Sequence, residues 1–402
     1  MPRHECSRPW LLPPLLRERS FVEQGQATGT SSLDAAFARA LELAARGSGR
    51  VSPNPLVGAV VLRDGAIVGD GFHDGPGTPH AEVVALRAAG DRARGATLVC
   101  TLEPCDHQGR TPACTAAVID AGIARVEYAS PDPNPLVDGR GARRLRTAGV
   151  QVRAGAHRGA ADRLNGAYLH HVRTGLPIVR WKAAATLDGK VAARDRTSRW
   201  ITGEAARRDV HAMRAWADAI VVGAGTALAD DPSLTVQLEG SRARPTMRVL
   251  VDAAGGTPAS GALFDGAPPT LVATTERSPS SVRDAWRAAG AEVLVLDGTR
   301  GTEDERGGLV ALRPLLEDLG KRDVQGVLLE GGPTLAWGFA SAGLIDQVVL
   351  YLAPKLLGGI EAPGALGGTG FAPVTEALDL RIDAVDRIGD DVRVEAHVHR
   401  DH

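Results

Sequence analysis

The sequence is poor in the features that mark several large classes of protein. Only 4% of its residues are aromatic and its formal net charge is −2, whereas a dedicated nucleic-acid surface would be basic and carry aromatic side chains. No stretch approaches the roughly 18 uncharged apolar residues of a membrane-spanning helix. Four cysteines in 402 residues are too few for a disulfide scaffold. What is left is a globular chain, and 44% hydrophobic and 23% charged residues are typical of one.

Length and local composition indicate two folded domains after an N-terminal extension. At about 150 residues per domain, 402 residues predict two or three domains. Residues 1–30 contain several early prolines and the polar run EQGQATGTSS, so we expect a disordered extension there. The segment HHVRTGLP, near residues 170–177, supplies glycine and proline for a linker. We therefore predict folded domains at residues 31–174 and 175–402.

The first domain alternates between helix and strand patterns. Ser32 is the expected N-cap of a helix whose apolar residues recur at helical spacing from Leu33 to Ala44. The runs VGAVVLR and AIVGDGF meet at Asp64-Gly65, which predicts a β-hairpin. Further strand-like runs (ATLVCTL, ARVEYAS, VQVRAG) alternate with helical ones (HAEVVALRAAG, TPACTAAVIDAG, GARRLRTAG). This order predicts a three-layer α/β domain.

The second domain is also α/β in pattern. Its strand-like runs are IVRWKAAA, DAIVVGA, MRVLVDA, PTLVAT, AEVLVLD, GVLLEGG and QVVLYLAP, and the polar segment 298–308 is expected to be a loop. No G-x-G-x-x-G follows the first strand, so a Rossmann domain is not indicated. Three glycine-bearing segments do occur at strand ends (VVGAGTALADDPSLT, LLEGGPTLAWG, APKLLGG). They are either plain strand-to-helix connections or places where backbone N–H groups bind a phosphorylated ligand.

One histidine and two cysteines form the most informative pattern. His80 precedes Glu82 by two residues, and Cys105 and Cys114 lie in TLEPCDHQGRTPAC. Three such ligands suit Zn²⁺ and leave a fourth position open, as in catalytic zinc sites. Because residues two apart on a helix point about 200° apart, His80 and Glu82 converge only if the helix starts just after His80. Thr111-Pro112 is expected to open the helix that carries Cys114, so that both helix N-termini face the metal.

Glu82 then has a clear chemical task. A carboxylate beside zinc can move a proton from water to a leaving amine, as in zinc-dependent base deamination. The competing interpretation is a structural zinc, which requires a fourth protein ligand. His107 is a candidate for that ligand, although a substrate contact is favoured. Cys100, in the middle of a strand-like run, is expected to be a buried hydrophobe, and His73 is expected to be structural or solvent-facing.

The first domain resembles the deaminase half of the bifunctional riboflavin-biosynthesis deaminase/reductase family. The resemblance rests on PNPLVGAVV, GTPHAEVVAL, TLEPCDHQGRTPAC and DPNPLVDGRG, and on the eight residues between the two cysteines, where the general deaminase pattern has two. It implies a cytidine-deaminase-like fold. The residues implied are the zinc ligands His80, Cys105 and Cys114, the proton shuttle Glu82, and the substrate contacts Asn54, His107 and Arg110.

The second domain is similar to the reductase half of the same family. The strings KAAATLDGKVA, SRWITGEAARRDVHAMRAWADAIVVGAGTALADDPSLTV and EGGPTLAWGF carry the similarity, in the same order along the chain. It implies a dihydrofolate-reductase-like α/β fold that uses NADPH. The residues implied are Ala184, Trp200, Thr226, Asp230, Gly332, Pro333 and Thr334 for the cofactor, and Ser198, Arg214, Leu234 and Glu330 for the substrate.

Two positions depart from the family pattern. Gln237 stands where arginine is common, and Ala253 stands where serine is common. The first puts one phosphate contact in doubt and the second a minor cofactor hydrogen bond. Arg242 and Arg244 follow in the same segment, and either is a candidate to supply the missing positive charge; the alternative is that both are solvated surface residues.

The resemblance implies a two-step enzyme with one Zn²⁺ per chain and NADPH. The first domain would deaminate 2,5-diamino-6-(5-phosphoribosylamino)pyrimidin-4-one, and the second would reduce the ribosyl group of the product to ribityl. We expect a cytoplasmic homo-oligomer that binds phosphorylated pyrimidines, and neither nucleic acid nor membrane. The alternatives are a tRNA or nucleic-acid base deaminase with an appended domain, and a structural zinc module joined to a nucleotide-sensing domain.

Overall fold

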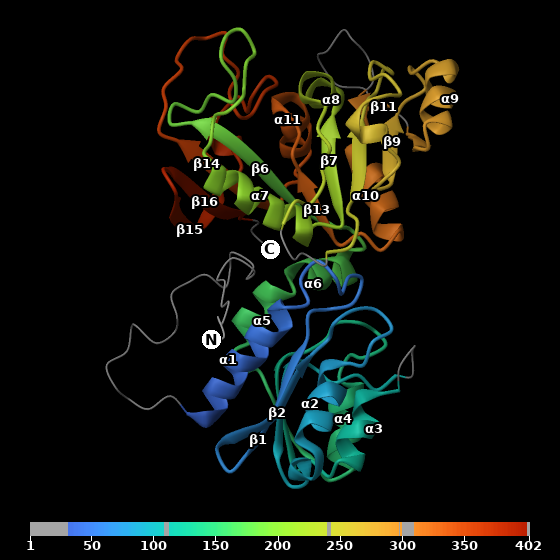
Figure 1. The fold of residues 1–402 in the computed structure, drawn as a ribbon, viewed down its shortest axis with the longest axis vertical. Helices are drawn as coiled ribbons and strands as arrows, with labels where there is room; N and C mark the ends of the chain where they lie inside the picture. Colours follow the sequence, from blue (N-terminus) through green and yellow to red (C-terminus); the bar gives the residue numbers. More distant parts are fainter. Residues whose placement is uncertain (1–30, 108–111, 239–242, 297, 300–308, 400–402) are drawn as a thin grey trace, which may run out of the picture. The chain divides into compact units, whose positions relative to one another are not determined.

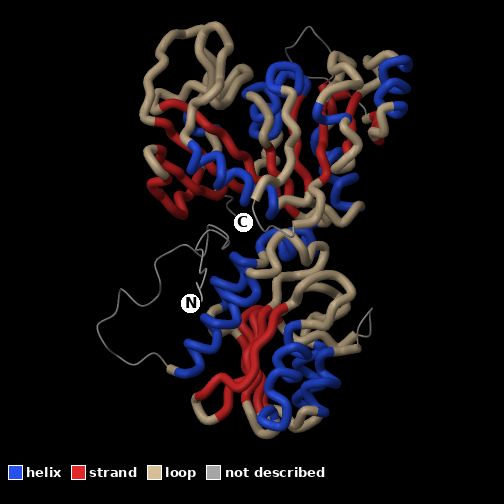
Figure 2. Tube along the Cα trace, in the orientation of Figure 1, coloured by secondary structure: helices blue, strands red, loops and turns tan. Residues whose placement is uncertain are grey.

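A computed structural model describes residues 31–107, 112–238, 243–296, 298–299 and 309–399. The chain divides into two compact units, with the division between Thr174 and Gly175, and each unit is described by itself (Figure 1). Both units alternate between helices and strands (Figure 2). In the described ranges, no helix combines the length and hydropathy needed to cross a membrane. The expected extension at 1–30 lies outside the described residues.

The first unit is built on a five-stranded sheet with the order β2-β1-β3-β4-β5. Strand β1 is antiparallel to β2 and β3, while β3, β4 and β5 are parallel. The predicted hairpin is confirmed, since Arg63 pairs with Ala66 and the two residues between them have positive φ. The strands are β1 (Gly58–Arg63), β2 (Ala66–Phe72), β3 (Thr97–Leu102), β4 (Arg125–Ser130) and β5 (Gln151–Ala154).

Helices cover both faces of this sheet, which confirms the predicted three layers. Buried Val60 of β1 packs in one apolar cluster with α1 and α5, and its neighbours Ala59 and Val61 pack in another with α2, α3 and α4. This is the period-2 alternation of a strand buried on both faces. The helices are α1 (Ser32–Ala45), α2 (Ala81–Ala89), α3 (Cys114–Asp120), α4 (Arg140–Thr147), α5 (Arg158–Leu164) and α6 (Gly166–Thr174), with a 3₁₀ turn, η3 (Gly90–Ala93).

The N-cap of α1 differs from the prediction by one residue. Ser31, not Ser32, is the cap: its backbone is extended, and its Oγ accepts the amide N–H of Asp34 at 3.2 Å. Ser32 is the first helical residue. Two consecutive serines offer the same capping chemistry, so residue type alone did not separate them.

The second unit is a mixed α/β structure around a nine-stranded sheet with the order β10-β9-β8-β7-β13-β6-β14-β16-β15. Its first seven strands are parallel, and β16 and β15 add an antiparallel hairpin. The strands are β6 (Ile178–Thr186), β7 (Ala219–Gly223), β8 (Met247–Val251), β9 (Thr270–Thr274), β10 (Glu292–Val295), β13 (Gly326–Leu329), β14 (Gln347–Ala353), β15 (Leu380–Ile388) and β16 (Asp391–Val398).

Two apolar layers hold the second unit together. Leucines of α10 and Phe339 of α11 pack on one face of the sheet, and Met213 of α7 and Trp286 of α9 pack on the other. The helices are α7 (Glu204–Trp216), α8 (Ala224–Asp230), α9 (Ser280–Ala288), α10 (Leu312–Lys321) and α11 (Pro333–Ser341), with the 3₁₀ turns η4 (Ala262–Phe264) and η5 (Val374–Glu376).

Four strands of this unit were not expected from the sequence. Strands β15 and β16 were missed, and β15 is exposed along nearly its whole length, so it shows no buried apolar face to reveal it. The segment 298–308 was expected to be a loop. It begins instead with β11 (Gly298–Thr299), which pairs with β12 (Leu309–Val310); residues 300–308 lie outside the described part.

Candidate functional site

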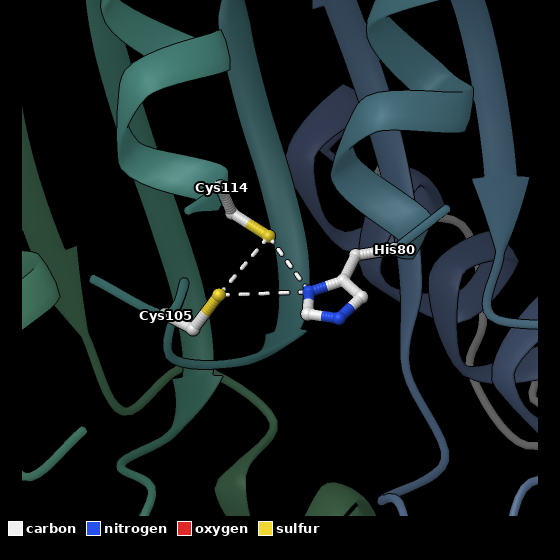
Figure 3. A group of neighbouring side chains, drawn as sticks. All are labelled: His80, Cys105 and Cys114. Carbon is white, nitrogen blue, oxygen red and sulfur yellow. Dashed lines mark hydrogen bonds between the residues drawn. The ribbon is translucent and has the colours of Figure 1, made fainter. Parts of the chain in front are cut away.

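His80, Cys105 and Cys114 converge on one point in the first unit (Figure 3). His80 Nδ1 lies 3.0 Å from Cys114 Sγ and 3.5 Å from Cys105 Sγ, and the two sulfurs are 3.4 Å apart. A tetrahedral zinc with bonds of about 2.0–2.3 Å separates its ligand atoms by roughly 3.3–3.8 Å. Both contacts of Cys105 fall in this range and the His80–Cys114 contact is slightly shorter, so the side chains form one face of a tetrahedron close to the size that zinc requires. The open side is left for a fourth ligand.

Helix starts place the donor atoms. His80 is the N-cap of α2, with φ −68° and ψ 159°, so the helix begins directly after it, as predicted. Glu82 then lies in the first turn, where its side chain can approach the same point as that of His80. Cys105 follows β3, and Cys114 is the first residue of α3.

The start of α3 corrects one expectation. Pro112 was expected within the first turn, but the helix begins at Cys114, after an extended Ala113 with ψ 134°. The amide of Thr115 donates instead to the carbonyl of Cys105, at 3.2 Å. This hydrogen bond ties the two cysteine-bearing segments together and sets where the helix can begin.

Glu103 has a structural task beside the cysteines. Its carboxylate is buried and accepts the amide N–H groups of Gly139 and Ala142, both at 3.2 Å, at the start of α4. A Cβ at Gly141 would lie 1.8 Å from the carbonyl oxygen of Pro104, so only glycine permits this contact. The start of α4 is thus fixed against the segment that leads into Cys105.

The charges at the cluster are strongly coupled. The hydrogen bond between the sulfurs lowers the pKa of Cys105 to about 4 and raises that of Cys114. Burial raises the pKa of the Glu82 carboxyl, and the negative charge of Cys105 raises it further. A raised pKa makes the carboxylate a better proton acceptor, which suits a proton shuttle.

A pocket of about 190 Å³ opens onto this cluster, enough for a small ring and several times the minimum for one water. Of the predicted substrate contacts, Asn54 and His107 line it, and Arg110 lies outside the described residues. Sequence reasoning missed the other polar groups that line it: His73, Asp132, Asn134 and Tyr168.

His73 and His107 can now be assigned to the pocket. His73 is 4% exposed, so it is not solvent-facing; its Nε2 lies 2.9 Å from Asn54 Nδ2, and its ring is 5.4 Å from that of His80. The Nδ1 atom of His107 is buried and has no hydrogen-bond partner within the described part of the chain. Such an atom is available to a ligand in the pocket. Cys100 is fully buried, as predicted, in the apolar layer of α2 to α4.

In the second unit, Glu330 is the centre of a buried ion cluster. Its carboxylate accepts two hydrogen bonds from Arg214, at 2.6 and 3.0 Å, and Lys182 Nζ lies 3.1 Å away. Burial would favour the neutral acid, but the charges of Lys182 and Arg214 lower the pKa of Glu330 to about 2. The structure thus brings the predicted Arg214 and Glu330 together as a pair and adds Lys182, which sequence reasoning did not select.

The residues expected to face NADPH lie on three segments of this unit. Ala184 is on β6 and Thr226 on α8, while Gly332 is the N-cap of α11 and Pro333 and Thr334 form its first turn. Thr226 Oγ1 accepts the amide N–H of Gly332 at 3.0 Å, which joins two of the segments.

The remaining two cofactor residues are Trp200, in the loop after β6, and Asp230, the last residue of α8. Trp200 is 64% exposed, with the guanidinium groups of Arg199 and Arg207 at 5.9 and 4.6 Å from its ring. Arg199 also donates to the carbonyl of Asp230, at 2.7 Å. An exposed indole close to two guanidinium groups, and an α-helix whose N-cap is Gly332, suit a flat, polyanionic dinucleotide, so these residues fit NADPH.

The other substrate residues are placed less directly. Leu234 is 2% exposed and packs in the core with α7, so its side chain is not available to a ligand. Ser198 lies in the loop that carries Trp200. The amide of Gln237 donates to His211 Nδ1 at 3.2 Å, on the side of α7 that also carries Arg214.

Family models match both units. Residues 30–130 match the cytidine and deoxycytidylate deaminase zinc-binding region, and residues 177–394 match the RibD C-terminal domain. The riboflavin biosynthesis protein RibD of Bacillus amyloliquefaciens is 42% identical over 358 residues, covering 89% of this chain and 94% of that protein. RibD of Escherichia coli K12 is 40% identical over 367 residues, covering 89% and 96%.

Solved structures of this family match as well. RibD of Acinetobacter baumannii (form 1) gives a TM-score of 0.81 at 36% identity, covering 92% of this chain and 99% of that one. A diaminohydroxyphosphoribosylaminopyrimidine deaminase/5-amino-6-(5-phosphoribosylamino)uracil reductase of Thermotoga maritima gives 0.79 at 33% identity, also covering 92% and 99%. The chain belongs to the RibD family of riboflavin-biosynthesis proteins, with a zinc-binding deaminase domain followed by a reductase domain that uses NADPH.

Proposed function

We propose that the chain deaminates 2,5-diamino-6-(5-phosphoribosylamino)pyrimidin-4-one and then reduces the ribosyl group of the product to ribityl. The observation that carries the first step is the triangle of His80, Cys105 and Cys114 with the Glu82 carboxyl in the same pocket. The relatives named as deaminase/reductase support the substrate. A structural zinc is not favoured, because the three donors leave one coordination position facing a pocket rather than a fourth protein ligand.

In the first step, His80, Cys105 and Cys114 would hold the metal, and Glu82 would move the protons. Zinc, when bound, supplies a Lewis acid that lowers the pKa of the attacking water. Glu82 would accept a proton as the water oxygen bonds to C2 of the ring and deliver it to the adjacent ring nitrogen, which has gained the electrons of the C=N bond. It would then take the remaining O–H proton and give it to the exocyclic amine as the C2–N bond breaks. Ammonia leaves, and the ring keeps the oxygen as a carbonyl.

The polar groups of the pocket wall would orient the ring. The substrate presents N–H donors on an aminopyrimidine, and the wall offers the Asp132 carboxylate, the Asn54 side chain and the ring of His73. Asp132 is 5% exposed, so its oxygen atoms are shielded from bulk water, and this strengthens their hydrogen bonds to a bound ring. Asn134 and His107 also line the pocket and are candidates for the ribose phosphate side of the substrate.

In the second step, the Lys182–Glu330–Arg214 cluster would bind the phosphorylated sugar. Two cations around one carboxylate leave a net positive charge, which suits a ribose phosphate. NADPH, when bound, supplies the hydride. The acceptor is the ribose carbon in its open-chain imine or carbonyl form, and a proton completes the reduction. Ala184, Trp200, Thr226, Asp230 and the Gly332-Pro333-Thr334 turn are the proposed cofactor contacts.

The test is product identification with the full-length protein. The zinc-loaded enzyme is incubated with the diaminopyrimidine phosphate, with and without NADPH, and the products are identified by mass. We expect ammonia and the deaminated ribosyl compound without NADPH, and the ribityl compound with it. Consumption of NADPH without ammonia release, or neither product, would reject the assignment.

The cellular compartment and the oligomeric state are each proposed from one observation. The three described cysteines, Cys100, Cys105 and Cys114, are free thiols, which agrees with a reducing compartment such as the cytoplasm. A homo-oligomer is proposed because strand β15, at the edge of the second sheet, exposes Leu380, Ile382 and Val385. Light scattering of the purified chain tests this: a monomeric mass at micromolar concentration would reject it.

A further inference from the structure

The segment between the two matched regions contributes one wall of the deaminase pocket. The zinc-binding region ends at residue 130 and the reductase match begins at 177. Asp132, Asn134, Val137 and Tyr168 all lie between these limits, and all line the pocket that holds Glu82. The metal centre and this wall are therefore separate parts of the chain, and the wall is where recognition of a particular ring can be built.

Tyr168, on α6, makes the most specific contact in this wall. Its hydroxyl donates to the carboxylate of Asp132, at 2.9 Å from Oδ1 and 3.1 Å from Oδ2. Both residues are buried, at 7% and 5% exposure. The ring of Tyr168 packs with Leu102 and Leu169, so the hydroxyl is held from behind by apolar contacts. The hydrogen bond therefore joins a fixed donor to a carboxylate that faces the pocket.

Asp132 depends on such support. A buried carboxylate without an ion pair must be stabilised by N–H or O–H donors. The backbone amide of Asn134 supplies one hydrogen bond, to Oδ1 at 2.9 Å, and the Tyr168 hydroxyl is the side-chain donor. A carboxylate accepts about four hydrogen bonds, so capacity remains for N–H groups of a bound ring.

A residue three positions before Tyr168 anchors a second segment that lines the pocket. Asn165, between α5 and α6, is 2% exposed. It accepts the amide N–H of Leu56 at 2.8 Å and donates to the carbonyl of Leu56 at 2.9 Å. Leu56 stands two residues after Asn54. Asn165 and Tyr168, at the junction of α5 and α6, thus anchor the two segments that bring Asn54 and Asp132 to the pocket.

Building on the proposed deaminase activity, we propose that Tyr168 is a positioning residue for ring recognition: its hydroxyl holds the Asp132 carboxylate with free lone pairs toward the N–H groups of the aminopyrimidine. Without the hydroxyl, the Asp132 carboxylate can turn toward other donors. Part of the free energy of substrate binding is then used to orient the carboxylate again. The role concerns binding of the ring and leaves proton transfer by Glu82 untouched. It therefore predicts a change in KM rather than in kcat.

The test uses the full-length, zinc-loaded enzyme and four variants. Tyr168→Phe removes only the hydroxyl and keeps the ring. Asp132→Asn removes the charge that the hydroxyl supports, and the double variant completes a cycle. Tyr128→Phe is the matched control, because Tyr128 is equally buried, at 6%, on β4 of the same unit and does not line the pocket. Deaminase KM and kcat, zinc content, melting temperature and reductase activity on the deaminated intermediate are measured for each.

Tyr168→Phe is expected to raise the deaminase KM about tenfold, the effect of one hydrogen bond to a charged group, and to change kcat less than about threefold. Zinc content and reductase activity should stay at the wild-type level. In the Asp132→Asn background the same change should alter KM by less than about twofold, because the group that Tyr168 positions is already altered. Tyr128→Phe should leave KM unchanged.

Three outcomes would overturn the positioning role. Equal KM effects of Tyr168→Phe in both backgrounds would show that Tyr168 acts without Asp132. Equal effects of Tyr168→Phe and Tyr128→Phe would show a general packing effect, and loss of zinc or folding in Tyr168→Phe would show a structural role. Failure of the proposed function is distinct, since the wild-type enzyme itself would then release no ammonia.

Discussion

The two units reach their sites in different ways. The deaminase site draws its metal ligands and Glu82 from two short stretches, His80 to Glu82 and Cys105 to Cys114, which lead into α2 and α3. The reductase cluster draws Lys182 from β6, Arg214 from α7 and Glu330 from the end of β13. The first can be recognised from residue types and spacing, because few tasks other than metal binding require a histidine and two cysteines together. The second consists of common charged residues that gain meaning only when the fold buries them together.

A variant of either cysteine gives the largest contrast between the units. Cys105→Ala or Cys114→Ala should abolish zinc binding and deamination, because two donors do not hold a catalytic zinc. Reduction of the deaminated intermediate should persist, since the Glu330 cluster lies in the other unit. Metal analysis and separate assays of the two reactions provide the measurement. Cys100→Ala, a buried thiol outside the triangle, is the control and should keep its zinc. Undiminished zinc in either cysteine variant would contradict the ligand assignment.

Glu82→Gln should produce the next largest effect. Removal of a general acid–base group typically lowers a rate by about 10²- to 10⁴-fold. We expect that fall in deaminase kcat with zinc content unchanged, because Glu82 is not one of the three donors. The reductase reaction again serves as the internal control. Ammonia release at the wild-type rate would contradict the proton-shuttle role.

These two experiments concern the part of the site that the sequence predicts well. The donor triangle, the helix start after His80 and the burial of Cys100 follow from local pattern and residue chemistry. Asp132 and Tyr168 were missed because a carboxylate and a phenol, 36 positions apart, show no spacing that relates them. Their pairing depends on α6 packing against Leu102 of β3, which is a property of the tertiary fold.

In the fold too, some elements can be predicted from the sequence and others cannot. Strands buried on both faces, such as β3 and β7, stand out as apolar runs, and all of the sequence's strand-like runs became strands. The β15–β16 hairpin did not stand out, because β15 exposes polar and apolar residues alike and pairs only at the edge of the sheet. Strand β15 pairs with β16 along its length, while only Ile388 at its end is buried.

Glu330→Gln tests the second unit. Its folded pKa of about 2 lies below the ordinary 4.5, so the charged carboxylate contributes about 3 kcal/mol to stability. The sign follows from the lowered pKa: this contribution is present above pH 4.5 and is lost as the pH falls toward 2. The gap in unfolding free energy between wild type and Glu330→Gln should therefore be largest near pH 7 and shrink in acid.

Urea unfolding followed by tryptophan fluorescence measures this gap. Five of the six tryptophans of the sequence lie in the second unit, so the signal reports mainly that unit. Glu292→Gln is the control, because Glu292 forms an exposed pair with Arg322 and should matter by less than about 0.5 kcal/mol. A gap that stays constant between pH 7 and pH 3 would show that the Glu330 charge does not stabilise the fold.

Arg244→Ala tests the smallest expected effect, and the structure revises what it should do. Arg244 was a candidate to replace the missing arginine at position 237, but it is paired with the buried carboxylate of Asp218. Asp218 directly precedes β7 and lies beside Gly326, the first residue of the parallel strand β13. Glu330 directly follows β13, four residues after Gly326. At about 3.3 Å per residue, that is roughly 13 Å from the cluster expected to bind phosphate.

Arg244 should therefore act on stability and not on substrate. Its removal leaves Asp218 with the amide N–H groups of Gln325 and Gly326, at 2.6 and 3.0 Å, so the carboxylate is still partly satisfied. We expect a loss of about 1–2 kcal/mol in unfolding free energy and an unchanged reductase KM. Arg387→Ala, at an exposed ion pair with Asp390, should change neither. A tenfold rise in KM for the phosphorylated intermediate in Arg244→Ala alone would instead place Arg244 at the phosphate. An unchanged KM leaves Arg214 and Lys182 as the cations of the described chain that can meet that charge.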